Sequence, residues 1–169
     1  MPGSPTDGEG AATVTIPASV YLWYVDLALG QMTAIVEELG DDLVNRRPPF
    51  RDANSAYVIL THCLGVMEYW GGATVAQRPV QRDRAAEFTA SGDVAGLLRR
   101  TEQASRRLRE DLVGLDSAAP PVNVRRNPDE PVPYHEAKGA VLVHVLEELF
   151  QHLGQMELTR DSIVAGQHR

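Results

Sequence analysis

Residues 144–161 read HVLEELFQHLGQMELTRD, and this stretch decides the fold. Its apolar residues recur every three or four positions, which is the spacing of one face of an α-helix. The series begins just before the stretch and comprises Leu142, Val145, Leu146, Leu149, Leu153 and Met156. This spacing predicts a long amphipathic helix over residues 136–165 that packs one face into a core.

Three further helical segments are expected before this one. After Pro17, apolar residues recur at helical spacing up to Gly40, which suits the position just past a helix end. Residues 54–70 are apolar almost all round, so this helix should be buried on several sides, and the pair Gly71 and Gly72 is expected to end it. A weaker apolar stripe runs from Asp93, a plausible N-cap, to Leu112. Its arginines are expected on a solvent-exposed face, namely Arg99, Arg100, Arg106 and Arg107.

The connections between these segments are long. They cover residues 41–53, 73–91 and 116–135, and connections of this length are typical of functional loops. No strand-like alternation of apolar and polar residues occurs between them. The pattern therefore predicts an all-α fold, a four-helix bundle formed by residues 17–169 as a single domain, with residues 1–16 as a mobile N-terminal tail.

Composition excludes several classes of protein. The chain has 169 residues and a net charge of −7, whereas a protein that binds nucleic acid needs a cationic surface. The single cysteine, Cys63, excludes disulfides within the chain. No run approaches the roughly 18 uncharged apolar residues of a membrane span, and no signal peptide is evident, so we expect a cytoplasmic protein without a membrane partner.

Two polar residues interrupt the apolar face of the last helix. Because a helix turns about 100° per residue, Glu148 and His152 lie at the edge of that face, one turn apart. A buried charge without a partner is costly, and a divalent metal is one partner that a carboxylate and an imidazole can share. A Glu–His surface pair is the alternative. His144 lies about 12 Å along the axis from His152, too far for both to bind one ion readily.

Residues 54–70 offer a third ligand in His62, whose helical neighbours are apolar. His62, Glu148 and His152 would form a site with two histidines, one carboxylate and open positions, which is the pattern of a catalytic metal site. A hydrogen-bonded structural histidine is the alternative for His62. Gln155 can reach the same side as an outer partner or a substrate contact, or it is a solvated amide. Cys63 diverges from His62 and is expected to be a small buried hydrophobe.

The quoted stretch, in the form H-x-x-x-E-x-x-x-H-x-G-Q, resembles the last-helix motif of the DinB-like metalloprotein superfamily. The resemblance is to the branch that contains mycothiol-dependent maleylpyruvate isomerase and other mycothiol S-transferases. THCLGVMEYW at residues 61–70 resembles the second-helix motif of this branch, with His62, Gly65, Glu68 and Trp70. RDRAAEF at residues 82–88 is similar to a stretch that follows that helix.

The resemblance implies a bundle with a long crossover between its second and third helices, often a homodimer. It places the metal ligands at His62, Glu148 and His152, and it implies zinc, with nickel or iron possible, and mycothiol as thiol cosubstrate. The implied activity is S-transfer from mycothiol to a small electrophile. A hydrolase that uses a metal-activated water and a non-catalytic stress or regulatory protein are the alternatives.

Three side chains have expected roles in that activity. Arg82 and Arg84 are expected to hold an anionic group, or instead to form ion pairs with Asp83 or Glu87. Gln155 is expected to orient the thiol or a water molecule. The isomerase of this branch has a second domain, for which we expect no room in this chain. Of 16 basic residues only Lys138 is lysine, a bias that agrees with an actinobacterial host able to make mycothiol.

Overall fold

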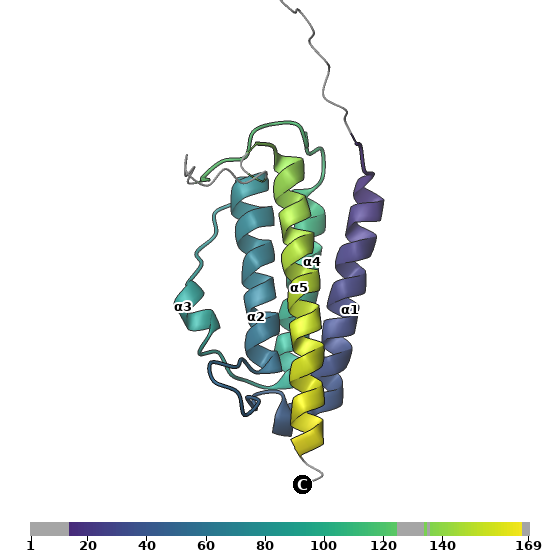
Figure 1. Ribbon diagram of the computed structural model, residues 1–169. Coiled ribbons are helices and arrows are strands. Elements are labelled where there is room, and N and C mark those ends of the chain that lie inside the picture. Colours follow the sequence, from purple (N-terminus) through teal and green to yellow (C-terminus); the bar gives the residue numbers. More distant parts are fainter. Residues whose placement is uncertain (1–13, 125–133, 135, 167–169) are drawn as a thin grey trace, which may run out of the picture.

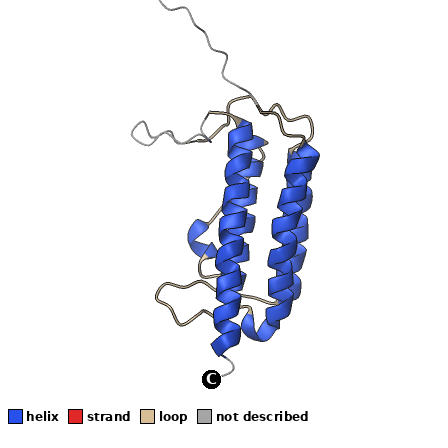
Figure 2. Cartoon of the chain, turned by 45° about the vertical axis from the view of Figure 1, so that its right-hand side comes forward, coloured by secondary structure: helices blue, strands red, loops and turns tan. Residues whose placement is uncertain are grey.

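The computed structural model describes residues 14–124, 134 and 136–166, and these form a bundle of long helices (Figure 1). The elements in chain order are α1 (Ala18–Leu43), α2 (Ala56–Val66), the π-helix η1 (Met67–Val75), α3 (Arg84–Glu87), α4 (Val94–Asp111) and α5 (Lys138–Ala165). No strand occurs in the described ranges (Figure 2). The predicted all-α fold is confirmed, and the short helix α3 lies within the predicted long connection.

Each helix of the bundle has two main neighbours. Helix α1 packs against α4 and α5, and the continuous segment α2–η1 packs against the same two helices. Helices α4 and α5 therefore lie diagonally across the core. The sequence pattern alone left this order of neighbours open.

The predicted apolar stripes form the core. On α5 the buried residues include Leu142, Val145, Leu149, Leu153 and Met156. On α1 they include Val25, Leu29, Met32, Val36 and Leu39. Helix α2 is buried along almost its whole circumference, as its composition predicted.

Two glycines do not end the second helix, and this prediction is wrong. The helical segment continues as η1 through Gly71 and Gly72 to Val75. A Cβ atom at position 71 would lie 2.7 Å from the Leu108 methyl of α4, and one at position 72 would collide with the Arg78 guanidinium. Glycine is needed here because other groups pack against the helix backbone, so tertiary packing outweighs the local tendency to end a helix.

The other helix ends agree with the expected signals. Gly40 has φ +60° and a non-helical conformation inside α1, so it makes a kink before the last helical residues, which end at Leu43. Asp93 caps α4, because its carboxylate accepts a hydrogen bond of 2.6 Å from the Gly96 amide. Ser55 caps α2 in the same way.

The N-terminal part of the chain is described from Val14 onward. Residues 14–16 are exposed and lie outside any helix, while residues 1–13 of the predicted tail lie outside the described residues. Helix α1 is long and apolar enough by length and composition to cross a membrane. In the bundle its apolar face is core, with Val25, Met32 and Val36 buried against the other helices.

Candidate metal centre

Helix α2 carries His62 at a buried position facing α5. The His62 side chain is part of a helix whose residues are nearly all buried, and only 6% of its surface is exposed. A buried imidazole needs polar partners on both ring nitrogens. The His62 partners come from two different segments, α5 and α3.

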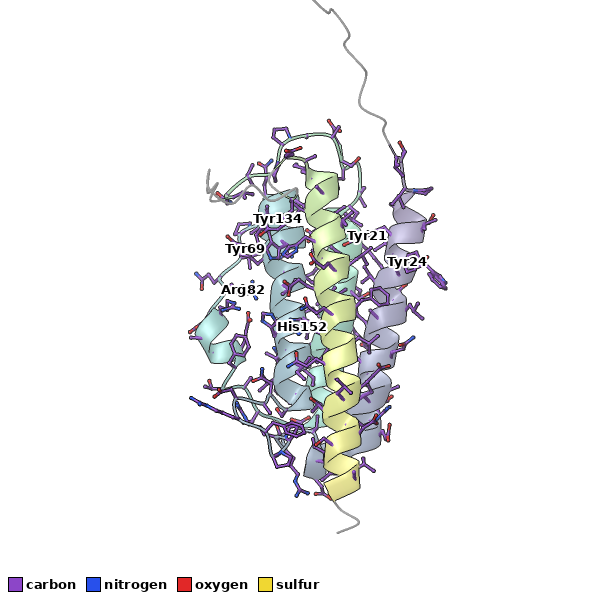
Figure 3. The ribbon with its side chains drawn as sticks, in the orientation of Figure 1. Tyr21, Tyr24, Tyr69, Arg82, Tyr134 and His152 are labelled. Carbon is purple, nitrogen blue, oxygen red and sulfur yellow. The ribbon has the colours of Figure 1, made fainter. Side chains whose placement is uncertain are left out.

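Helix α5 supplies two of the groups around His62. Glu148 Oε2 lies 3.3 Å from His152 Nε2 and 3.8 Å from His62 Nε2. One donor atom from each of these residues lies within 4.8 Å of the other two. The structure therefore brings together the three residues that the sequence predicted as metal ligands. Figure 3 shows His152 on the side of α5 that faces α2, with Tyr69, Arg82 and Tyr134 on the same side of the bundle.

Both histidines turn the same ring nitrogen toward Glu148. The Nδ1 atom of His62 donates to Glu87 Oε2 at 2.8 Å, and Nδ1 of His152 donates to Gln155 Oε1 at 2.9 Å. With Nδ1 protonated, Nε2 of a neutral imidazole carries a lone pair, and both lone pairs face the carboxylate. Two lone pairs and a carboxylate repel each other unless a cation lies between them, so this donor set fits a divalent metal.

Electrostatics keeps negative charge at this centre. When a histidine of the metal-free centre carries a second proton on Nε2, that nitrogen donates to Glu148. These hydrogen bonds, from His152 and then His62, outweigh the effect of burial and lower the pKa of Glu148 well below its usual range. Glu148 in turn raises the pKa of His152 through their hydrogen bond, against the opposing effect of burial. A site with an ionised carboxylate and a basic imidazole favours a bound cation.

Glu87, on α3, is a hydrogen-bond partner of His62 that the sequence did not reveal. Its carboxylate is buried and also accepts hydrogen bonds from Arg82 Nε at 2.7 Å and Arg82 Nη2 at 3.0 Å. Burial would raise the pKa of Glu87, but the hydrogen bonds from Arg82 and His62 together lower it. Metal-binding histidines commonly donate their second N–H to such a carboxylate, which fixes the ring orientation.

Gly65 provides the space for this carboxylate. A Cβ atom at position 65 would collide with Glu87 Oε1, so Glu87 passes close to the backbone of α2. The sequence contained two signals, the glycine three residues after His62 and the segment 82–88. Neither signal indicates that Glu87 of the segment 82–88 accepts a hydrogen bond from His62 of α2.

The other predicted site residues, Gln155, Arg82 and Arg84, lie outside the group formed by His62, Glu148 and His152. Gln155 is exposed and touches His152 on the side away from Glu148, so it holds the ring as an outer partner. Arg82 forms the ion pair with Glu87 that was the alternative for this arginine. The exposed Arg84 guanidinium lies 5.2 Å from the ring centre of Phe88. The Phe88 ring centre in turn lies 5.1 Å from that of His62, so Phe88 contacts both Arg84 and His62.

An aromatic cluster borders Glu148 on its other side. His144 Nε2 lies 3.8 Å from Glu148 Oε1, and the His144 ring stacks on Tyr134 at 4.3 Å. Trp70 meets both rings edge-on. His144 is not one of the three grouped ligands, in line with its distance from His152 along the helix.

Cys63 is fully buried next to His62 in sequence. Burial, and then the charges of Glu148 and Glu87, raise the pKa of its thiol far above neutral pH. Because the thiolate is the nucleophilic form, Cys63 is unsuited to attack a substrate. It packs as the small hydrophobe that the sequence predicted.

Comparison with protein families gives a match over most of the chain. The family model described as mycothiol-S-transferase matches residues 22–165, a range that contains His62, Glu148 and His152. Neither the curated proteins nor the solved structures gave a significant match.

Proposed function

The chain belongs to the mycothiol-S-transferase family, and from this premise we propose that it is a metal-dependent transferase acting on mycothiol and a small electrophile. We propose that His62, Glu148 and His152 hold the metal ion. The observation that carries the proposal is the grouping of their donor atoms within 4.8 Å, with the second nitrogen of each histidine already bonded.

The donor set favours zinc among the divalent metals. Zinc accepts imidazole nitrogen and carboxylate oxygen, and three protein ligands leave a position open for substrate. Nickel and iron accept the same donors. A bound divalent ion would supply positive charge that lowers the pKa of a thiol and makes thiolate available near neutral pH.

The protein side chains contribute orientation and charge. Glu87 and Gln155 hold the two imidazole rings so that both Nε2 atoms face Glu148. Because Cys63 is buried and its thiol stays protonated, the reacting sulfur has to come from a cosubstrate. We propose that Gln155 acts on the reacting groups through His152. Because Arg82 is already paired with Glu87, we propose that it holds that carboxylate, and that Arg84 attracts an anionic group of a substrate.

The proposal extends to the setting of the protein. We propose a cytoplasmic enzyme of an actinobacterial host that uses small molecules as partners, with neither nucleic acid nor membrane involved. The net charge of −7 supports the exclusion of nucleic acid. We also propose a homodimer, for which the exposed aromatic residues of α1 offer a surface.

Metal content tests the centre directly. Elemental analysis of the purified chain should give about one zinc per chain. The Glu148→Ala variant should bind zinc at least about tenfold more weakly in competition with a chelator. Glu157→Ala, which removes an exposed carboxylate from the same helix, is the matched control and should bind like the wild type. Equal zinc affinity in the wild type and Glu148→Ala would refute the ligand assignment.

Activity assays separate the proposed function from its alternatives. The zinc-loaded chain is incubated with alkyl halide, epoxide and ester substrates, with and without mycothiol. We expect conjugation that requires both mycothiol and metal. Ester hydrolysis without thiol would favour a hydrolase instead, and tight zinc binding without turnover of any substrate would favour a non-catalytic protein.

A further inference from the structure

A cavity of about 540 Å³ lies outside the metal centre, between α2, α4 and the connection that carries α3. Small-molecule sites in proteins typically have volumes of roughly 300–1,000 Å³, so the cavity can hold a small ligand. Glu87 and Arg82 contribute to its wall, but His62, Glu148 and His152 do not. A ligand in this cavity would therefore be separate from the reacting groups at the metal.

The cavity is rich in arginine although the chain as a whole is acidic. Four arginines and three acidic residues line it. Three of the arginines are neutralised by ion pairs, which join Arg78 to Glu68 and Asp111, Arg82 to Glu87, and Arg107 to Glu68. The fourth, Arg100, has no carboxylate within ion-pair distance among the described residues.

Arg100 is instead held by two hydroxyl groups. Its Nη1 atom donates to Thr61 Oγ1 at 3.3 Å and to the Tyr57 hydroxyl oxygen at 3.5 Å. Because both oxygens accept from Arg100, their own protons are left to donate to another group. The guanidinium and the two hydroxyls all belong to the cavity wall, so they form a group of donors with a net positive charge. Such a group is suited to an anion.

We propose that this cavity binds a small organic carboxylate, with the anionic group on Arg100, Thr61 and Tyr57. One unneutralised arginine matches a single negative charge better than the double charge of phosphate. The same wall includes Leu64 and Ala104, which can pack against a carbon skeleton. This site goes beyond the proposed S-transferase activity and does not depend on it.

Titration of the isotope-labelled full-length chain, followed by NMR, tests the proposal with three probes. Benzoate should bind saturably and shift the amide signals of Thr61, Arg100 and Ala104. Benzamide, which has the same shape without the charge, should bind at least about tenfold more weakly, and inorganic phosphate should also bind more weakly. Failure of benzoate to saturate, or tighter binding of phosphate or benzamide, would overturn the proposal.

A pair of variants assigns the binding to Arg100. Arg100→Gln should weaken benzoate binding at least about tenfold. Arg99→Gln, which removes the neighbouring exposed arginine that is not in the cavity wall, should bind like the wild type. Both positions are exposed, so retained spectra should show that the variants fold. Equal binding in Arg100→Gln and the wild type would overturn the site.

Metal removal tests whether benzoate binds in this cavity or at the candidate metal centre. The zinc-saturated chain and the chain treated with a chelator should bind benzoate with dissociation constants within about threefold of each other. Loss of benzoate binding on metal removal would place the ligand at the metal centre and overturn the inference. The result is independent of S-transferase turnover.

Discussion

At the scale of single residues, the protonation of the His152–Glu148 pair is linked to the stability of the fold and to the proposed metal binding. The hydrogen bond that His152 donates to Glu148 raises the pKa of His152 above its usual value of about 6.5. In the metal-free protein the pair therefore stabilises the fold fully below about pH 6.5, and this contribution is lost as pH rises through the folded pKa. The pKa of Glu148 is lowered, so this carboxylate stays ionised throughout that range.

This linkage predicts how the metal-free protein responds to pH. The free energy of unfolding of the chelator-treated chain, measured with urea, should be lower at about pH 8.5 than at about pH 5.5. In His152→Asn the difference between the two pH values should be smaller, because the titrating imidazole is gone. A pH dependence of the same size in both proteins would contradict the assignment. Zinc affinity should rise over the same range, since the metal competes with the proton on His152.

The residues of the candidate centre differ in how far the sequence predicts them. His62, Glu148 and His152 interrupt apolar helix faces, and helical spacing alone places them toward the core. Glu87 lies in a connection 25 positions after His62, and no periodicity relates the two. Its contact with His62 depends on the path of residues 76–83, which local sequence signals do not determine.

At the scale of the elements, the approach of α3 to α2 places Glu87 against His62 on the outer side of the candidate metal centre. Gly65 is the position at which the two helices meet through Glu87. An alanine there should displace the Glu87 carboxylate from His62 without removing any ligand. We expect Gly65→Ala to bind zinc about tenfold more weakly, as measured by competition with a chelator.

The last helix offers a matched control for this substitution. A Cβ atom at Gly154 would meet nothing within 4 Å, and φ at this position is ordinary. Gly154→Ala should leave zinc affinity unchanged and raise the free energy of unfolding by about 0.5–1 kcal/mol, as expected for alanine in a helix. Zinc affinity equal to that of the wild type in Gly65→Ala would argue against a role for the Glu87 contact.

Helix boundaries could be predicted where the signal is local. The cap at Asp93 and the change of direction at Gly40 follow from single residues. The extension of the second helix through η1 does not, because Gly71 and Gly72 are typical of helix ends. Only the close approach of Leu108 and Arg78 explains why glycines lie inside this helix.

At the scale of the whole molecule, exposed aromatic residues gather on one side of the bundle. Trp23, which is 58% exposed, packs edge-on against Tyr24 at 5.0 Å, and Tyr24 lies 6.3 Å from Phe150 of α5. Figure 3 shows Tyr24 on the side of α1 that faces away from α2 and α3. Exposed apolar patches of this kind commonly mark protein interfaces.

The proposed homodimer predicts a defined effect at this surface. Trp23→Glu should raise the dimer dissociation constant at least about tenfold, as measured by sedimentation equilibrium, because aromatic residues often dominate interface energies. Val113→Glu changes an even more exposed apolar residue, 82% exposed, beyond the end of α4 and should leave the dimer intact. A monomeric wild type, or a dimer unaffected by Trp23→Glu, would refute this interface.

The overall arrangement of the helices was less predictable than their existence. Amphipathic stripes indicate that four helical segments share a core, but they do not say which helices are diagonal. That order depends on the shapes of the packed side chains and on the connections. It determines that α2 and α5 are neighbours, and hence that His62 meets Glu148 and His152.

The π-helix after α2 also determines in which direction, relative to His62, the chain leaves this helix. Its backbone bonds span five residues, as in the bond from the Ala76 amide to the Gly71 carbonyl, so each turn holds more residues than an α-helical turn. Loss of one residue from Met67–Val75 without a change in the winding would rotate everything after the deletion relative to His62. The direction in which the chain leaves this helix, and with it the delivery of Arg82 and Glu87 to the outer side of His62, therefore depends on the number of residues in η1.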